Sequence, residues 1–168
     1  MLGSIIGDII GSRFEINPIT SKSFNLFDNS CRFTDDTVLT VAIADALLAK
    51  KDYKSKVLDY GLKYHNKGYG PGFIRWGDSK GKTQGHSYGN GSAMRIAAVG
   101  FYFETKEKVV EQAKKAVEMT HNHPEGIKGA QAIALAIFLA RNGYSKEEIK
   151  FEISNKFEYK FDQSISEI

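Results

Sequence analysis

A run of hydroxyl and carboxyl side chains, Thr34-Asp35-Asp36-Thr37, places several hard oxygen donors within one turn of chain. Oxygen atoms of this kind are the ligands that Mg²⁺ prefers, so the run is a candidate metal site. The same residues also fit the start of a helix, with Thr34 as the N-cap and two carboxylates in the first turn, where the helix dipole favours negative charge. From these residues alone both interpretations stay open.

Two further carboxylates lie upstream, seven residues apart. Asp8 lies among isoleucines and glycines, where an unpaired charge is costly, so we expect it to have a fixed partner such as the following loop. Glu15 shares a face with Asp8 if the helix continues, or lies at its C-terminal end if the helix stops near Gly11. From that end its carboxylate could reach a substrate.

The run from Ser87 to Arg95 reads Ser-Tyr-Gly-Asn-Gly-Ser-Ala-Met-Arg. Gly-Asn-Gly permits unusual backbone angles, and a helix that begins near Ser92 would direct free N–H groups at an anion such as phosphate. A Gly-Asn-Gly turn capped by Ser92 explains the same residues without a ligand. These two interpretations also stay open.

Two other motifs carry weaker signals. In the polar turn Thr120-His121-Asn122-His123, we expect one imidazole to contact a ligand and the other to face solvent, because no third histidine or cysteine lies close by to complete a zinc site. Gly81-Lys82-Thr83 resembles the end of a phosphate-binding loop. However, Trp76 stands where that loop's first glycine belongs and no apolar strand precedes it, so ATP binding by this route is rejected.

Helices are predicted around these runs, over residues 2–11, 37–49, 53–65, 92–103, 106–119, 125–142 and from 145 onward. Glycines at 3, 7 and 11 would form a bare stripe open to another backbone, and segment 37–49 is apolar almost all round, which is typical of a central helix. Nine glycines between positions 61 and 91 predict loops. Because no alternating strand pattern is present, we predict an all-α fold.

Bulk properties limit the class of protein. The 168 residues, 42% of them hydrophobic, suit a single domain over 1–168, and a net charge of +3 without a dense basic stripe argues against nucleic-acid binding. The lone cysteine, Cys31, favours a reducing compartment. No membrane span or signal peptide is predicted, so we expect a cytoplasmic location.

Four motifs, taken in order, resemble the ADP-ribosylglycohydrolase family. They are Gly3-x-x-x-Gly7-Asp8-x-x-Gly11-x-x-x-Glu15, Thr34-Asp35-Asp36-Thr37, Ser87-Tyr88-Gly89-Asn90-Gly91-x-Ala93-Met94-Arg95 and Thr120-His121. The resemblance extends to about Ala140. It implies a compact orthogonal helical bundle and a pair of Mg²⁺ ions, with Mn²⁺ as the other candidate. It also implies hydrolysis of the glycosidic bond between ADP-ribose and a protein side chain.

The resemblance also implies roles for individual residues. Thr34, Asp35 and Asp36 would be metal ligands, and Glu15 and Asp35 the catalytic residues. The metal would polarise ribose hydroxyls or a bound water, and Glu15 would act as general acid or base. The residues implied at the substrate are Gly72, Ser87, Tyr88, Gly89, Asn90 and His121.

One family motif is missing. The second metal motif, Gly-Gly-Asp-[Ser/Thr]-Asp-Thr, does not occur in this sequence, and its last residues, including Phe157, Phe161 and Ile165, still look core-forming. We therefore expect a truncated domain without its C-terminal helices, or half a site that self-association or another chain completes. The expected partner is an ADP-ribosylated protein or a small ADP-ribosyl compound. The alternatives are a module that binds ADP-ribose without cleaving it and an oligomerising structural fragment.

Overall fold

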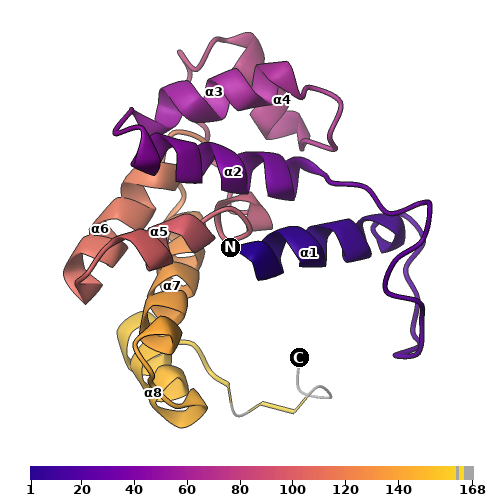
Figure 1. The fold of residues 1–168 in the computed structure, drawn as a ribbon. Helices are drawn as coiled ribbons and strands as arrows, with labels where there is room; N and C mark the ends of the chain where they lie inside the picture. Colours follow the sequence, from indigo (N-terminus) through magenta and orange to yellow (C-terminus); the bar gives the residue numbers. More distant parts are fainter. Residues whose placement is uncertain (162, 165–168) are drawn as a thin grey trace.

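The computed structural model describes residues 1–161 and 163–164, and these residues form α-helices joined by loops (Figure 1). Two short 3₁₀ turns, Ser12–Phe14 and Asn90–Ser92, occur between them. The described part of the chain contains no strand, only an isolated bridge between His86 and His121, so the all-α prediction is confirmed. The helices are α1 (Leu2–Gly11), α2 (Asp35–Leu48), α3 (Tyr53–Lys63), α4 (Pro71–Asp78), α5 (Ala97–Tyr102), α6 (Lys106–Val117), α7 (Pro124–Arg141) and α8 (Lys146–Phe157).

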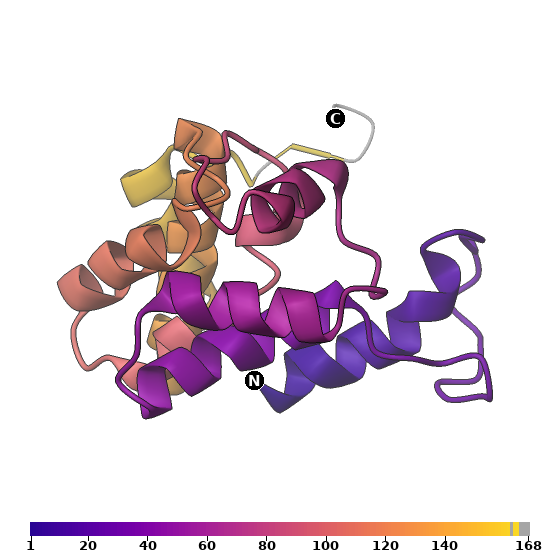
Figure 2. The same cartoon turned by 90° about the horizontal axis from the view of Figure 1, so that it is seen from above.

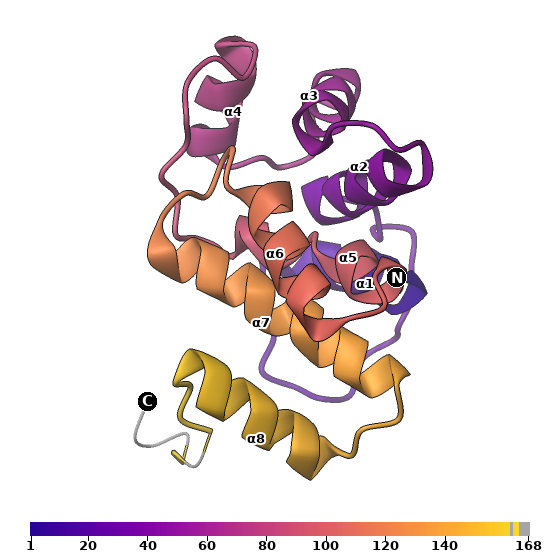
Figure 3. The same cartoon turned by 90° about the vertical axis from the view of Figure 1, so that its left-hand side faces the viewer.

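The helices stack in layers on either side of α2 and α7. Helix α3 packs on α2, α5 packs against both α2 and α7, and α8 lies along the far side of α7 (Figure 3). Helix α2 is buried on most sides, and its own residues Leu39 and Ile43 are among the buried ones. This burial confirms the prediction of a central helix. It therefore provides a rigid base for the acidic residues at its N-terminus.

Helix α1 lies at one end of the molecule and contacts α2, with the 17–33 loop extending beyond it (Figure 2). It has no buried residue, and Leu2 is 76% exposed. A Cβ atom placed on Gly3, Gly7 or Gly11 would meet no atom within 4 Å. No described backbone therefore approaches the glycine stripe.

The prediction of loops throughout the glycine-rich segment is wrong for Pro71–Asp78, which forms α4. Proline at the first helical position is favourable because its missing N–H would be unpaired there in any case. Trp76 is buried, and the Phe73 ring lies close enough to Gly61 of α3 to leave no room for a Cβ atom there. Because α4 precedes Gly81-Lys82-Thr83 where a phosphate-binding loop needs a strand, the rejection of ATP binding by that route gains support.

Helix α5 begins at Ala97, five residues later than the predicted start at 92. Side chains tie the preceding segment to other parts of the chain. The Ser92 hydroxyl donates to the carbonyl oxygen of Gly126 at 2.7 Å, and Arg95 Nη2 donates to Thr120 Oγ1 at 2.6 Å. The prediction of a helix start near Ser92 is therefore wrong. The prediction that Ser92 caps the Gly-Asn-Gly turn is also wrong, because its hydroxyl bonds to Gly126.

The C-terminal helix begins where its local sequence predicts. Ser145 and Glu148 form the reciprocal capping box, and α8 ends at Phe157, before Glu158 with φ of 60° in the left-handed region. Phe157 lies in the core and Phe161 is half-exposed, whereas Ile165 lies outside the described residues. Among the described helices, none has the length and apolar character needed to cross a membrane.

Candidate active site

The N-terminus of α2 is bound to α1 through one carboxylate. Thr34 caps α2, its hydroxyl accepting from the Asp36 N–H at 3.3 Å. Asp8 of α1 accepts the backbone N–H of Thr34 at 2.9 Å, the Thr34 hydroxyl at 2.7 Å and the Thr37 N–H at 3.1 Å. The expected fixed partner of Asp8 and the helix-cap interpretation of Thr34 are both confirmed. A cap leaves carboxylate lone pairs free, so metal binding at the run stays a prediction.

Three carboxylates converge at this point, from α1, from the residue that follows the 3₁₀ turn Ser12–Phe14, and from α2. One oxygen each of Asp8, Glu15 and Asp36 lies within 4.8 Å of the others, and we call these three residues the acidic cluster. Burial raises the pKa of Asp36, and the charge of Asp8 raises it further. The pKa of Glu15 is also raised, by burial and by the charges of Asp36 and Asp8. A hard divalent cation would relieve this repulsion, and the donor set is of the kind such ions prefer.

Asp35 lies on a different side of the helix from Asp36, since successive residues of an α-helix are about 100° apart. Its side chain lines a separate cavity. Burial, and to a smaller extent the charge of Asp36, raises the pKa of Asp35 to about 6. Of the predicted ligands, Asp36 belongs to the acidic cluster and Asp35 lines the adjoining cavity, where the charges of the cluster still raise its pKa. Asp8 is the carboxylate of the acidic cluster for which no role in the site was predicted, although its charge within an apolar helix had marked it as unusual.

The cavity beside Asp35 has a volume of about 290 Å³. Of the residues predicted at the substrate, Gly72 on α4, Ser87 and Gly89 on the following loop, and His121 between α6 and α7 all line it. Tyr88 and Asn90 do not line it; both are exposed, and the Tyr88 ring lies 5.3 Å from the ring of His123. Four of the six predicted residues therefore come together from distant parts of the sequence.

Backbone pairing holds the 85–89 loop against the turn before α7. Gly85 N–H donates to Met119 O at 3.0 Å, and Ser87 N–H donates to Thr120 O at 3.3 Å. A Cβ atom on Gly85 would lie 2.3 Å from Thr120 O, so only glycine allows this approach. Loop and turn are thus fixed relative to each other.

The two histidines of the turn have different environments, as predicted. His121 is 7% exposed, and burial, assisted by the charge of Arg95, lowers its pKa to about 4. His123 is exposed and caps α7, with Nδ1 accepting from the Glu125 N–H at 3.2 Å. Only His121 can present its ring to the cavity.

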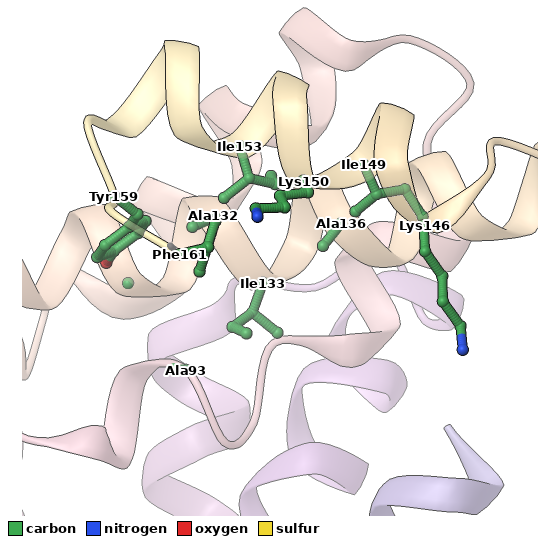
Figure 4. Close-up of a pocket in the computed structure, with 11 residues that line it drawn as sticks. Ala93, Ala132, Ile133, Ala136, Lys146, Ile149, Lys150, Ile153, Tyr159 and Phe161 are labelled. Carbon is green, nitrogen blue, oxygen red and sulfur yellow. The ribbon is translucent and has the colours of Figure 1, made fainter. Parts of the chain in front are cut away.

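A larger cavity, of about 670 Å³, lies between α7 and α8 (Figure 4). Apolar side chains such as Ile133 and Ile153 form most of its wall, with Lys146 and Lys150 as the charged residues of its lining. No carboxylate and no histidine occurs among the described residues that line it. Chemistry rather than volume therefore selects the smaller cavity as the candidate site.

Comparison with known proteins identifies the family. The model of the ADP-ribosylglycohydrolase family matches residues 1–166. The chain belongs to this family. It is 28% identical over 183 residues to ADP-ribosylhydrolase ARH3 of Mus musculus and 26% identical to ARH3 of Homo sapiens, in each case over 88% of this chain and 50% of the relative. It is also 29% identical to YegU of Escherichia coli (strain K12), over 70% of this chain and 40% of that protein. The chain thus spans about half the length of the curated relatives it matches.

Proposed function

We propose that this protein hydrolyses the glycosidic bond between ADP-ribose and a protein side chain, with Mg²⁺ as cofactor. The observation that carries the proposal is that the acidic cluster and the cavity lie next to each other in a member of this family. The acidic cluster lies at the same helix end as Asp35, which lines a cavity shared with His121 and the Ser87–Gly89 loop. The ARH3 relatives are named as ADP-ribosylhydrolases, which supports the reaction class.

The chain's oxygen donors suit a hard cation. We propose Thr34, Asp35 and Asp36, at the start of α2, as ligands of the ion. The nearby carboxylates of Asp8 and Glu15 would add negative charge that favours a cation. The ion would supply the positive charge that polarises a ribose hydroxyl or a water molecule. Mn²⁺ prefers similar oxygen ligands, so it is the other ion to test.

Glu15 is the proposed general acid or base. It is exposed, so a leaving group or a water molecule can reach it, and its pKa is raised above the ordinary value. A carboxyl group whose pKa moves toward neutrality exchanges protons more effectively at physiological pH. Asp35, whose pKa is about 6, is the second proposed catalytic carboxylate.

A second candidate function has a specific observation in its favour. The motif Gly-Gly-Asp-[Ser/Thr]-Asp-Thr does not occur in these 168 residues, whereas the cavity lined by His121 and Ser87 is present. A chain with part of the ligands can retain the cavity and bind ADP-ribose without cleaving it. Self-association is one way in which a second set of carboxylates could be brought to the site.

The deciding experiment measures release of free ADP-ribose from serine-linked and arginine-linked ADP-ribosyl peptides, with Mg²⁺, with Mn²⁺ and with EDTA. Calorimetric titration with ADP-ribose and light scattering on the same sample report binding and oligomeric state. Metal-dependent release would support hydrolysis if Asp36→Asn abolishes it and the control variant Asp59→Asn does not. Asp59 is an exposed residue of α3. Binding without release would support the binding module, and absence of both from the folded chain would refute the two proposals together.

A further inference from the structure

Arg95 is an unusual buried cation. It is fully buried between Asn90–Ser92 and α5, and no described carboxylate forms an ion pair with it. Its Nη2 donates to Thr120 Oγ1 at 2.6 Å, while Nε and Nη1 have no hydrogen-bond partner among the residues that the structure describes. The charge of Asp35, which lines the same cavity, favours the charged form of Arg95. Buried donors without partners are nevertheless costly, so packing alone is a poor explanation for an arginine at this position.

Counting protons around Thr120 shows where its hydroxyl must point. Val117 O already accepts two backbone bonds, from Thr120 N–H at 3.0 Å and His121 N–H at 2.9 Å, which uses both of its lone pairs. The Thr120 hydroxyl lies farther from it, at 3.3 Å, than from His121 Nδ1, at 2.9 Å. Since Arg95 is a donor, Oγ1 accepts from it on one lone pair, and this contact orients the hydroxyl. With both lone pairs of Val117 O in use, the hydroxyl proton is directed to His121 Nδ1.

The imidazole then has a defined tautomer. His121 is neutral near pH 7 because its pKa is lowered to about 4. A neutral imidazole that accepts at Nδ1 carries its proton at Nε2. The Nε2 edge lies beside Gly91, where a Cβ atom would be 3.0 Å from both Cε1 and Nε2, and Gly91 and His121 line the same cavity.

We propose that Arg95 is a positioning residue that acts through Thr120 to hold His121 in its Nε2–H tautomer. His121 then offers a hydrogen-bond donor to an oxygen of the bound ligand. The identity of that ligand as an ADP-ribosyl group rests on the proposed function, but the tautomer does not.

The test reads the tautomer directly, without a ligand. Long-range ¹H–¹⁵N spectra of the ¹⁵N-histidine-labelled chain distinguish protonated from bare ring nitrogens, and His121→Gln assigns the signals among the four histidines. At neutral pH we expect a protonated Nε2 and a bare Nδ1 in the wild type. A wild-type ring protonated at Nδ1 would overturn the proposal.

Matched variants test the relay. Thr120→Val removes the hydroxyl at nearly constant shape and should shift His121 toward a mixture of tautomers, whereas Thr120→Ser keeps the hydroxyl and should keep the wild-type pattern. Arg95→Met removes the donor that orients the Thr120 hydroxyl, so the hydroxyl can rotate and accept from a protonated Nδ1. This variant should therefore shift His121 in the same direction as Thr120→Val, with Arg95→Lys restoring the wild-type signals. If the Arg95 variants fail to fold, the Thr120 pair still decides, because an unchanged pattern in Thr120→Val refutes the relay.

Ligand affinity provides a second readout. Thr120→Val should weaken ADP-ribose binding about 3- to 10-fold, the loss of roughly one neutral hydrogen bond, and Thr120→Ser should not. Equal affinity of wild type and Thr120→Val, with the tautomer shifted, would overturn the role of the Nε2 proton in binding. A wild type that binds no ADP-ribose but shows the expected tautomer would refute the proposed function alone.

Discussion

Replacing Asp36 with asparagine should stabilise the metal-free protein and abolish its stabilisation by Mg²⁺. The carboxylate of Asp36 lies within 4.8 Å of those of Asp8 and Glu15, and the one hydrogen bond that it accepts, from the Thr34 hydroxyl, is long at 3.4 Å. Removing its charge therefore relieves repulsion at little cost in bonding. The two opposite effects separate a metal site from a helix cap.

The magnitude follows from Coulomb's law. For like charges 4.8 Å apart the repulsion is about 1 kcal/mol in water and about 3.5 kcal/mol at an effective dielectric constant of 20. Loss of a favourable helix-dipole interaction opposes this by about 0.3–1 kcal/mol. We expect a net gain of about 1–2 kcal/mol without metal, which at about 2–4 °C per kcal/mol raises Tm by roughly 2–8 °C.

Binding of the ion acts in the other direction. An ion present at 100 times its Kd stabilises the folded wild type by about 2.7 kcal/mol, or roughly 5–11 °C in Tm. In Asp36→Asn the cluster loses one of its three carboxylates, so this shift should vanish.

Thermal unfolding followed by circular dichroism, in EDTA and in a Mg²⁺ series, measures both effects. Asp59→Asn is the control, since this exposed residue of α3 lies outside the acidic cluster and should change neither Tm nor its Mg²⁺ dependence. A lower Tm of Asp36→Asn in EDTA, together with a wild-type response to Mg²⁺, would show that the acidic pair only caps α2.

Three other changes give distinct outcomes. The pKa of His121 is about 4 in the folded chain, against an ordinary histidine pKa of about 6.5, so the unfolded chain binds the extra proton first as pH falls. His121 therefore contributes about 3 kcal/mol of stability above pH 6.5 that is lost toward pH 4. In EDTA, the difference in urea-unfolding free energy between wild type and His121→Gln should shrink over that range, and a constant difference would contradict the buried neutral state. Gly7→Ala should stabilise the protein by about 0.5–1 kcal/mol, because a Cβ atom there meets nothing within 4 Å; destabilisation would show that another surface covers α1. Gly85→Ala should destabilise by about 2 kcal/mol or more, since its Cβ atom would overlap Thr120 O, and an unchanged urea midpoint would refute that close approach.

Local signals in the sequence were sufficient for most of the secondary structure. The caps at Thr34 and Ser145 and the apolar pattern of α2 lie within one segment of chain, so their geometry follows from neighbouring residues. Helix α4 could not be found in this way, because glycines at 72 and 77 lower helix propensity and burial of Trp76 outweighs that cost. The late start of α5 likewise depends on Arg95, whose partner lies 25 residues away.

The sequence by itself determined which chemistry is available. It showed adjacent carboxylates at a helix start, a lone charge in an apolar helix and a glycine-rich polar loop, because residue types and short spacings suffice to recognise them. Only the tertiary structure decided their grouping. Packing of α1 on α2 brings Asp8 and Glu15 to Asp36, while the helical turn between adjacent residues sends Asp35 to the cavity. The Thr120 hydroxyl meets Arg95, 25 residues away, only in the folded chain, since a hydrogen bond depends on distance in space and not on separation along the chain.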